Sequence, residues 1–184
     1  MSLFTSSRER RLWLISVLVI VAIYSTLGMA GVLSGFLRER GLLELSYMIG
    51  FLLVIVAIIG NALKRKQAKY EIWLQVGLFT VIGMIFLRMN MSPEERTHLF
   101  EYGFLALMIH EALIERKKNG KNKFHPAFLA IIITMILGCL DEFIQYMLPN
   151  RVFDLRDMGF NTFAGIMSVS ANNFFVWLRK KMPG

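Results

Sequence analysis

The sequence contains a single cysteine, Cys139, and that cysteine lies inside an apolar run. One cysteine cannot form an internal disulfide, and it excludes metal sites built from several cysteines. The sequence also lacks an internal repeat, a low-complexity tract and an HExxH motif. These absences leave one domain, without the motifs of cysteine-rich zinc proteins or zinc proteases.

Charged residues are also scarce, at 18% of the chain, whereas hydrophobic residues make up 55%. Soluble domains are about 45–50% apolar even when glycine is counted. The excess is gathered in runs close to the ~20 residues that a transmembrane helix needs. These runs cover residues 12–31, 42–63, 72–87, 98–114, 127–148 and 158–178. We therefore predict an all-α, polytopic membrane helical bundle with six transmembrane helices.

Basic residues alternate between the loops that join these runs. If the chain crosses the membrane six times, 15 of its 21 lysine and arginine residues fall on one side. Because basic residues are enriched in cytoplasmic loops, both termini are predicted to be cytoplasmic in a multi-pass protein of the bacterial inner membrane. The net charge of +8 is then explained by topology and by contacts with anionic lipids. We expect no nucleic-acid partner, since no basic stripe on a folded face is evident.

Polar residues gather at one end of the fourth and fifth runs. His98, Glu101 and Tyr102 are spaced i, i+3, i+4, so they share one helix face. Asp141 and Gln145 are spaced i, i+4 near the end of the fifth run. A charged side chain inside a span costs about 2.5–3.5 kcal/mol on insertion scales, so such residues usually face the interior of a bundle.

The sixth run carries a matching polar face at its start. Asp157 and Asn161 begin a stripe of polar and small residues at helical spacing. Asp157 lies near the predicted helix N-terminus, where the helix dipole favours a carboxylate. Asn161 is expected to hydrogen-bond Asp141, Gln145 or Asp157 across the helix interface. Three consecutive helices are thus predicted to turn polar faces inward at the extracytoplasmic end of the bundle.

At these residues the sequence resembles the VanZ-like family, which is named after a teicoplanin-resistance protein. One block is HLFEYGFLAL, in which His98 precedes Tyr102 by four residues. The other is DEFIQYMLPNRVFDLRDMGFNTFAG, with an acidic pair, glutamine, Pro-x-Arg, aspartate, asparagine and glycine in order. The resemblance covers roughly residues 85–180. Residues 1–84 are therefore predicted to hold additional transmembrane helices before a VanZ-like core at residues 85–184.

The resemblance implies a multispanning bacterial membrane protein of the cell envelope, without a settled biochemical activity. The leading hypothesis is an enzyme, a hydrolase or group transferase, that acts on a lipid-linked or cell-wall head group at the extracytoplasmic face. One alternative is a non-catalytic protein that binds lipid or glycopeptide, or acts as a scaffold, and confers teicoplanin-type resistance. Another is a small transporter. The expected partners are membrane lipids and a lipid-linked cell-wall or polysaccharide intermediate, and the oligomeric state stays open.

Nine residues are candidates for the site. The predicted catalytic residues are His98, Asp141, Glu142 and Arg151, and the predicted substrate-binding residues are Glu101, Tyr102, Gln145, Asp157 and Asn161. In this hypothesis Arg151 holds an anionic group, since guanidinium binds phosphate or carboxylate through two parallel hydrogen bonds. His98 and one of the two adjacent carboxylates transfer protons.

Structural explanations of the same residues stay open. Either adjacent carboxylate could form an ion pair that holds helices together. His98 could simply hydrogen-bond a carboxylate at a helix start. Arg151 could pair with Asp154 or Asp157. No cofactor is expected, although a divalent metal is an alternative, because histidine and several carboxylates offer suitable ligands.

Overall fold

The computed structural model describes residues 3–64, 69–88, 93–120, 124–148 and 155–181. The regular structure in these residues is entirely α-helical, which confirms the predicted all-α class. Each predicted apolar run coincides with one helix: α1 (Ser7–Glu39), α2 (Leu43–Lys64), α3 (Lys69–Arg88), α4 (Pro93–Lys118), α5 (Pro126–Tyr146) and α6 (Leu155–Lys181).

Local sequence signals explain where several helices begin and end. The side chain of Ser6 caps α1 by accepting a hydrogen bond from the backbone N–H of Glu9 at 3.0 Å. The turn between α1 and α2 contains Gly41 with a φ of 67°, a left-handed conformation that glycine adopts without a steric penalty. α5 starts with Pro126, whose missing N–H has no helical partner to lose at that position.

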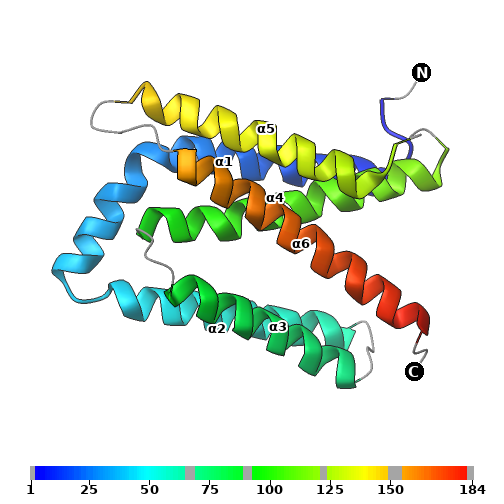
Figure 1. Ribbon diagram of the computed structural model, residues 1–184, viewed down its shortest axis with the longest axis horizontal. Helices are drawn as coiled ribbons and strands as arrows, with labels where there is room; N and C mark the ends of the chain where they lie inside the picture. Colours follow the sequence, from blue (N-terminus) through cyan, green and yellow to red (C-terminus); the bar gives the residue numbers. More distant parts are fainter. Residues whose placement is uncertain (1–2, 65–68, 89–92, 121–123, 149–154, 182–184) are drawn as a thin grey trace.

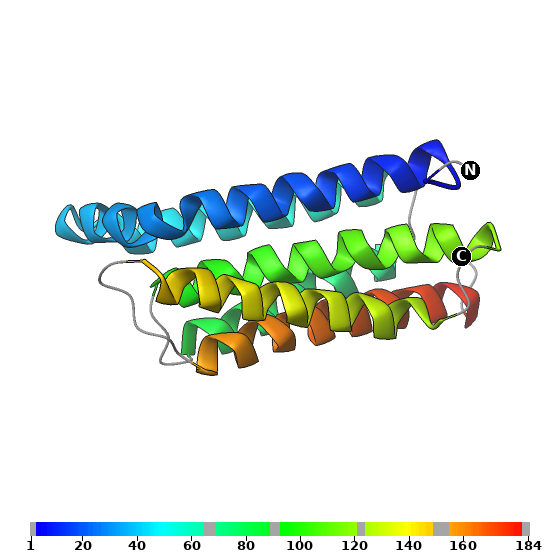
Figure 2. The ribbon, with the colours of Figure 1, turned by 90° about the horizontal axis from the view of Figure 1, so that it is seen from above.

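Helix α4 is the centre of the bundle. It packs against α1, α5 and α6, and α5 also packs against α6, whereas α2 and α3 pack mainly against each other (Figure 1). Both termini lie at the same end of the bundle in two perpendicular views (Figures 1 and 2). The start of α4, the end of α5 and the start of α6 therefore meet at the opposite end, where the polar residues were predicted.

The distribution of side chains along α5 is the reverse of that in a water-soluble protein. In α5, Thr134 and Asp141 are completely buried, whereas Ile136 and Phe143 are more than half exposed. Large apolar side chains can face outward in this way when the surrounding solvent is lipid. Among the described residues, two helical segments, Ser7–Met29 and Pro126–Tyr146, are long and apolar enough to cross a membrane. The six-span topology and the cytoplasmic termini stay predictions.

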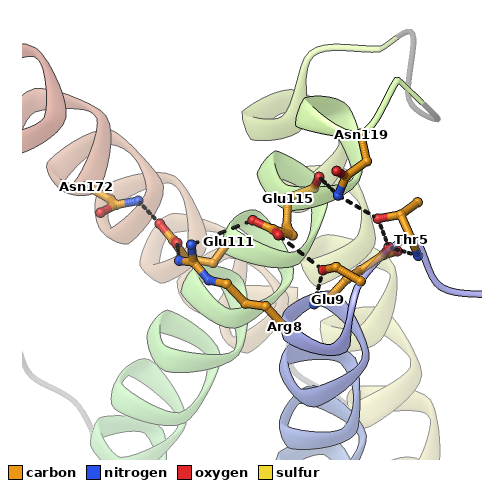
Figure 3. Close-up of polar contacts among 8 residues, drawn as sticks. Thr5, Arg8, Glu9, Glu111, Glu115, Asn119 and Asn172 are labelled. Atoms are coloured by element: carbon orange, nitrogen blue, oxygen red, sulfur yellow. Dashed lines mark hydrogen bonds and ion pairs between the residues drawn. The ribbon is translucent and has the colours of Figure 1, made fainter.

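A second group of polar residues joins α1, α4 and α6 at the end of the bundle that holds the termini (Figure 3). The guanidinium of Arg8 in α1 forms two ion pairs with α4, from Nη2 to Glu111 Oε2 at 2.9 Å and from Nη1 to Glu115 Oε2 at 3.6 Å. Asn172 of α6 donates a hydrogen bond to Glu111 at 3.2 Å. Glu9, beside Arg8, is fully buried. These contacts fix the start of α1 to α4 and so hold α1 along the bundle.

Candidate functional site

Three helices deliver polar side chains to one end of the bundle, as the helical spacing predicted. The first turns of α4 contribute His98 and Tyr102, which are both buried. The last turns of α5 contribute Asp141, Glu142 and Gln145. α6 begins at Leu155 and has Asp157 in its first turn, which confirms that this carboxylate lies at a helix N-terminus. Arg151, between α5 and α6, lies outside the described residues, so its predicted role stays a prediction.

One close polar contact between α4 and α5 joins His98 and Asp141. His98 Nδ1 lies 3.3 Å from Asp141 Oδ2, and the side chain of Asp141 is completely buried. The same nitrogen lies 3.7 Å from Glu101 Oε2, one helical turn away on α4, and Glu101 is 37% exposed. An imidazole between a buried and a partly exposed carboxylate is placed to accept and release a proton.

The two adjacent carboxylates of α5 have different surroundings. Asp141 faces His98 across the α4–α5 interface. Glu142 is 1% exposed, and its Oε1 accepts a hydrogen bond from Gln145 Nε2 at 3.4 Å on the same helix. The sequence left open which carboxylate partners His98, and the geometry selects Asp141.

Two tyrosines approach the backbone of α5 one turn before Asp141. Tyr102, which is completely buried, donates a hydrogen bond from its hydroxyl to the carbonyl oxygen of Leu137 at 3.3 Å. Tyr24 of α1 donates to the same oxygen at 2.9 Å. Tyr24 was not among the predicted residues because it lies in the first apolar run, more than 100 residues from its partner. The only sequence signal was a phenol in an apolar run that also contains the hydroxyls of Ser16, Ser25 and Thr26.

A close approach of α5 and α6 places Asn161 beside the site. A Cβ atom on Gly138 would lie 3.0 Å from Asn161 Cβ, so the two helices touch where α5 has no side chain. Asn161 is 1% exposed, and its Oδ1 accepts no hydrogen bond from the described residues. The sequence predicted that Asn161 hydrogen-bonds Asp141, Gln145 or Asp157, and its Oδ1 accepts no hydrogen bond from any described residue among them.

The described side chains form no evident metal site at this end of the bundle. Within the described ranges, no group of three or more histidine, cysteine, aspartate or glutamate side chains is arranged to hold a metal ion. A cavity of about 520 Å³ lies away from the polar end, between α3 and α6, and is lined by apolar side chains that include Trp73, Leu78 and Phe174. It contains none of the predicted site residues.

Replacing Tyr24 by phenylalanine tests whether α1 supports the site. We expect the variant to lose about 0.5–1.5 kcal/mol of stability, because one of two phenol hydrogen bonds to the Leu137 carbonyl disappears. Unfolding in detergent is followed through the reactivity of Cys139 with a fluorescent maleimide. Tyr102→Phe is the matched control for the other phenol, and the double variant reports the coupling between the two. No change in Tyr24→Phe would contradict a supporting role for α1.

Comparison with known proteins gives one match. No curated protein and no solved structure matches the sequence. The model of the family described as VanZ/LLP1 matches residues 17–176, which include all of the predicted site residues. This range also takes in most of residues 1–84, and the predicted domain boundary at residue 84 stays a prediction. Since the match covers most of the sequence, the chain belongs to the VanZ/LLP1 family.

Proposed function

We propose that this protein binds the polar head group of a lipid-linked envelope intermediate at the end of the bundle opposite its termini, and transfers a proton to or from it. Membership of the family suggests a membrane protein linked to glycopeptide resistance. The observation that carries the proposal is the 3.3 Å contact between His98 Nδ1 and the completely buried Oδ2 of Asp141. A buried carboxylate that orients a histidine is a recurrent arrangement for general acid–base chemistry.

In this proposal His98 exchanges the proton with the substrate, and Asp141 orients the imidazole. Glu101 is partly exposed beside His98, so it can relay a proton to water. Glu142 and Gln145 form a buried pair that supports the end of α5. Arg151, from the segment between α5 and α6, binds the phosphate or carboxylate of the head group. The reaction class is hydrolysis or group transfer.

The proposed location is the extracytoplasmic face of the bacterial inner membrane. The distribution of lysine and arginine supports it, since the loops at the end of the bundle that holds the termini carry most of these residues. The outward-facing apolar side chains of α5 support a lipid environment around the bundle. A lipid substrate would reach the site from the outer leaflet.

Two alternatives make different predictions. A binding protein without chemistry is favoured by the unsatisfied acceptor of Asn161, which needs a ligand but no proton transfer. A transporter is disfavoured by the layer between the two polar ends of the bundle, where Leu105, Ile109 and Val169 are at most 1% exposed. The buried hydroxyl of Thr134 in the same layer already bonds the Ala130 carbonyl, so the layer offers few polar partners to a solute crossing the bundle.

The experiment incubates purified protein with an envelope lipid extract and follows products by mass spectrometry. We expect the wild type to form a product that His98→Gln does not form, because glutamine keeps the approximate size of the side chain and cannot exchange a proton at neutral pH. Both proteins should elute identically on size exclusion, which controls for folding. If the wild type binds lipid and forms no new product, the catalytic proposal is wrong, and the alternative of a binding protein without chemistry is favoured.

A further inference from the structure

The cavity between α3 and α6 is an apolar groove on the outside of the bundle. Its volume is about 520 Å³, and its walls include Trp73, Leu78 and Val81 of α3 and Met167 and Phe174 of α6. Trp73 is 73% exposed and Phe174 is 48% exposed, so the groove is open to the surroundings of the protein. In a bilayer those surroundings are acyl chains, and an apolar wall without a partner forfeits dispersion contacts. The lining therefore suits a hydrocarbon chain.

Both walls of the groove lead to basic residues at the end of the bundle that holds the termini, where α3 begins and α6 ends (Figure 1). On α3, Lys69 lies about one turn before Trp73. On α6, Lys181 lies about two turns beyond Phe174, on the same face of the helix. The groove thus has an apolar floor and a basic mouth.

Two further contacts place basic groups at this mouth. Arg179 Nε donates a hydrogen bond at 3.2 Å to the carbonyl oxygen of Phe175, which also lines the groove. Lys181 Nζ lies 4.9 Å from the centre of the ring of Trp177, and this ring is half exposed. Tryptophan beside basic residues is typical of the head-group region of a membrane. The mouth therefore lies where a lipid phosphate would be.

These cations have no carboxylate partner within the part of the chain that the structure describes. The ion pairs of the described residues all involve other groups, and none includes Lys69, Arg179 or Lys181. Residues 158–184 contain no aspartate or glutamate. Glu71, in the first turn of α3, is buried. The positive charge at the mouth is thus available to an anion from outside the bundle.

We propose that an anionic phospholipid binds in this groove, with an acyl chain between α3 and α6 and its phosphate beside Lys69, Arg179 and Lys181. Basic residues at the cytoplasmic ends of transmembrane helices attract anionic head groups. Since α2 and α3 pack mainly against each other, the lipid would also join this pair of helices to α6. The inference goes beyond the proposed function, because the groove contains none of the residues of that site.

A second copy of the chain fits the groove less well than a lipid does. A symmetric dimer packed through this face would bring Lys69 and Lys181 of the two copies together at one membrane depth. Like charges at close range repel, whereas a phosphate between them offsets the repulsion. The charge at the mouth therefore favours an anionic lipid as the occupant.

The test compares lipids with the same acyl chains and different head groups. Purified full-length protein is presented with phosphatidylglycerol or phosphatidylcholine, and the retained lipid is counted by native mass spectrometry. We expect phosphatidylglycerol to be retained about tenfold more than phosphatidylcholine, because several basic residues act on its net negative charge. Glycerol 3-phosphate, which carries the phosphate without acyl chains, should not be retained.

Charge variants test the mouth of the groove. Replacing both Lys69 and Lys181 by glutamine removes one cation from each wall, and we expect the preference for phosphatidylglycerol to fall to within about twofold. Lys117→Gln with Lys118→Gln is the matched control. It removes the same charge from the end of α4, where both residues are exposed and neither lines the groove, and should keep the preference.

A space-filling variant tests the groove itself. Gly77 lines it, and a Cβ atom there would meet no atom within 4 Å, so the side chain in Gly77→Leu occupies the place of the acyl chain. We expect this variant to retain less of both lipids. Gly50→Leu is the matched control, since it makes the same change at an equally open position of α2 outside the groove. It should retain lipid as the wild type does.

Each contrary result has a definite meaning. Equal retention of the two lipids by the wild type overturns the anionic assignment. Retention of phosphatidylglycerol that neither the lysine variant nor Gly77→Leu reduces overturns the groove as the binding site. A dimer of the wild type that Gly77→Leu abolishes shows that a second copy occupies the groove, and this also overturns the proposal.

Discussion

Replacing Asp141 by asparagine is expected to lower the rate of product formation by about 10²–10⁴-fold, the usual contribution of general acid–base catalysis. The carboxylate lies 3.3 Å from His98 Nδ1 and is completely buried, so it fixes the orientation of the imidazole. An asparagine amide has no charge and cannot stabilise the imidazolium. The measurement is the initial rate of appearance of the product that the wild type forms from the envelope lipid extract.

Glu142→Gln is the matched control for this prediction. It makes the same chemical change at the neighbouring position, where the carboxylate accepts a hydrogen bond from Gln145 of its own helix. We expect the rate to fall by less than about tenfold, since glutamine keeps an acceptor oxygen for the Gln145 amide and the contact of Asp141 with His98 stays in place. A greater reduction in Glu142→Gln than in Asp141→Asn would show that the carboxylate beside His98 is not the one that acts.

Replacing Gly138 by valine is expected to separate α5 from α6. The new Cβ would lie 3.0 Å from Asn161 Cβ, an atom next to the backbone that cannot rotate away. Overpacking of this kind costs about 1–3 kcal/mol of stability. Because displacement of a reacting group by about 1 Å can cost 10²-fold in rate, product formation should fall further than the loss of stability explains. Thermal unfolding in detergent and the product assay measure the two effects.

The control is valine at Gly50 of α2, where a new Cβ meets no atom within 4 Å. Both changes alter the intrinsic helix preference equally, so the difference between them reports the close approach of α5 and α6 alone. We expect Gly50→Val to keep the stability and the activity of the wild type. Equal behaviour of the two variants would mean that α5 and α6 do not touch at Gly138.

The apolar runs predicted the helices well because hydrophobicity along the chain is a local property. The second run, residues 42–63, differs from α2 (Leu43–Lys64) by one residue at each end. The fourth run, residues 98–114, was too short, since α4 extends from Pro93 to Lys118. The turns of α4 outside the predicted run are rich in charged residues. A search for apolar residues therefore does not detect the part of a helix that continues beyond the membrane core.

The helical spacing also predicted part of the site. His98, Tyr102 and Asp141 come together as expected, because residues three or four apart share a helix face. The spacing could not say whether Asp141 or Glu142 faces His98, since the two adjacent side chains point about 100° apart on a helix of 3.6 residues per turn. That choice depends on how α5 is rotated about its axis relative to α4.

The sequence by itself determined that this chain is helical, that its apolar runs suit lipid, and which polar residues share a helix face. Only the tertiary structure decided that Asp141 partners His98, that Tyr24 of α1 reaches the backbone below the site, and that Arg8 is held by Glu111. The physical reason is that periodicity fixes the faces of one helix, whereas the rotation and depth of neighbouring helices follow from close approaches such as Gly138 against Asn161.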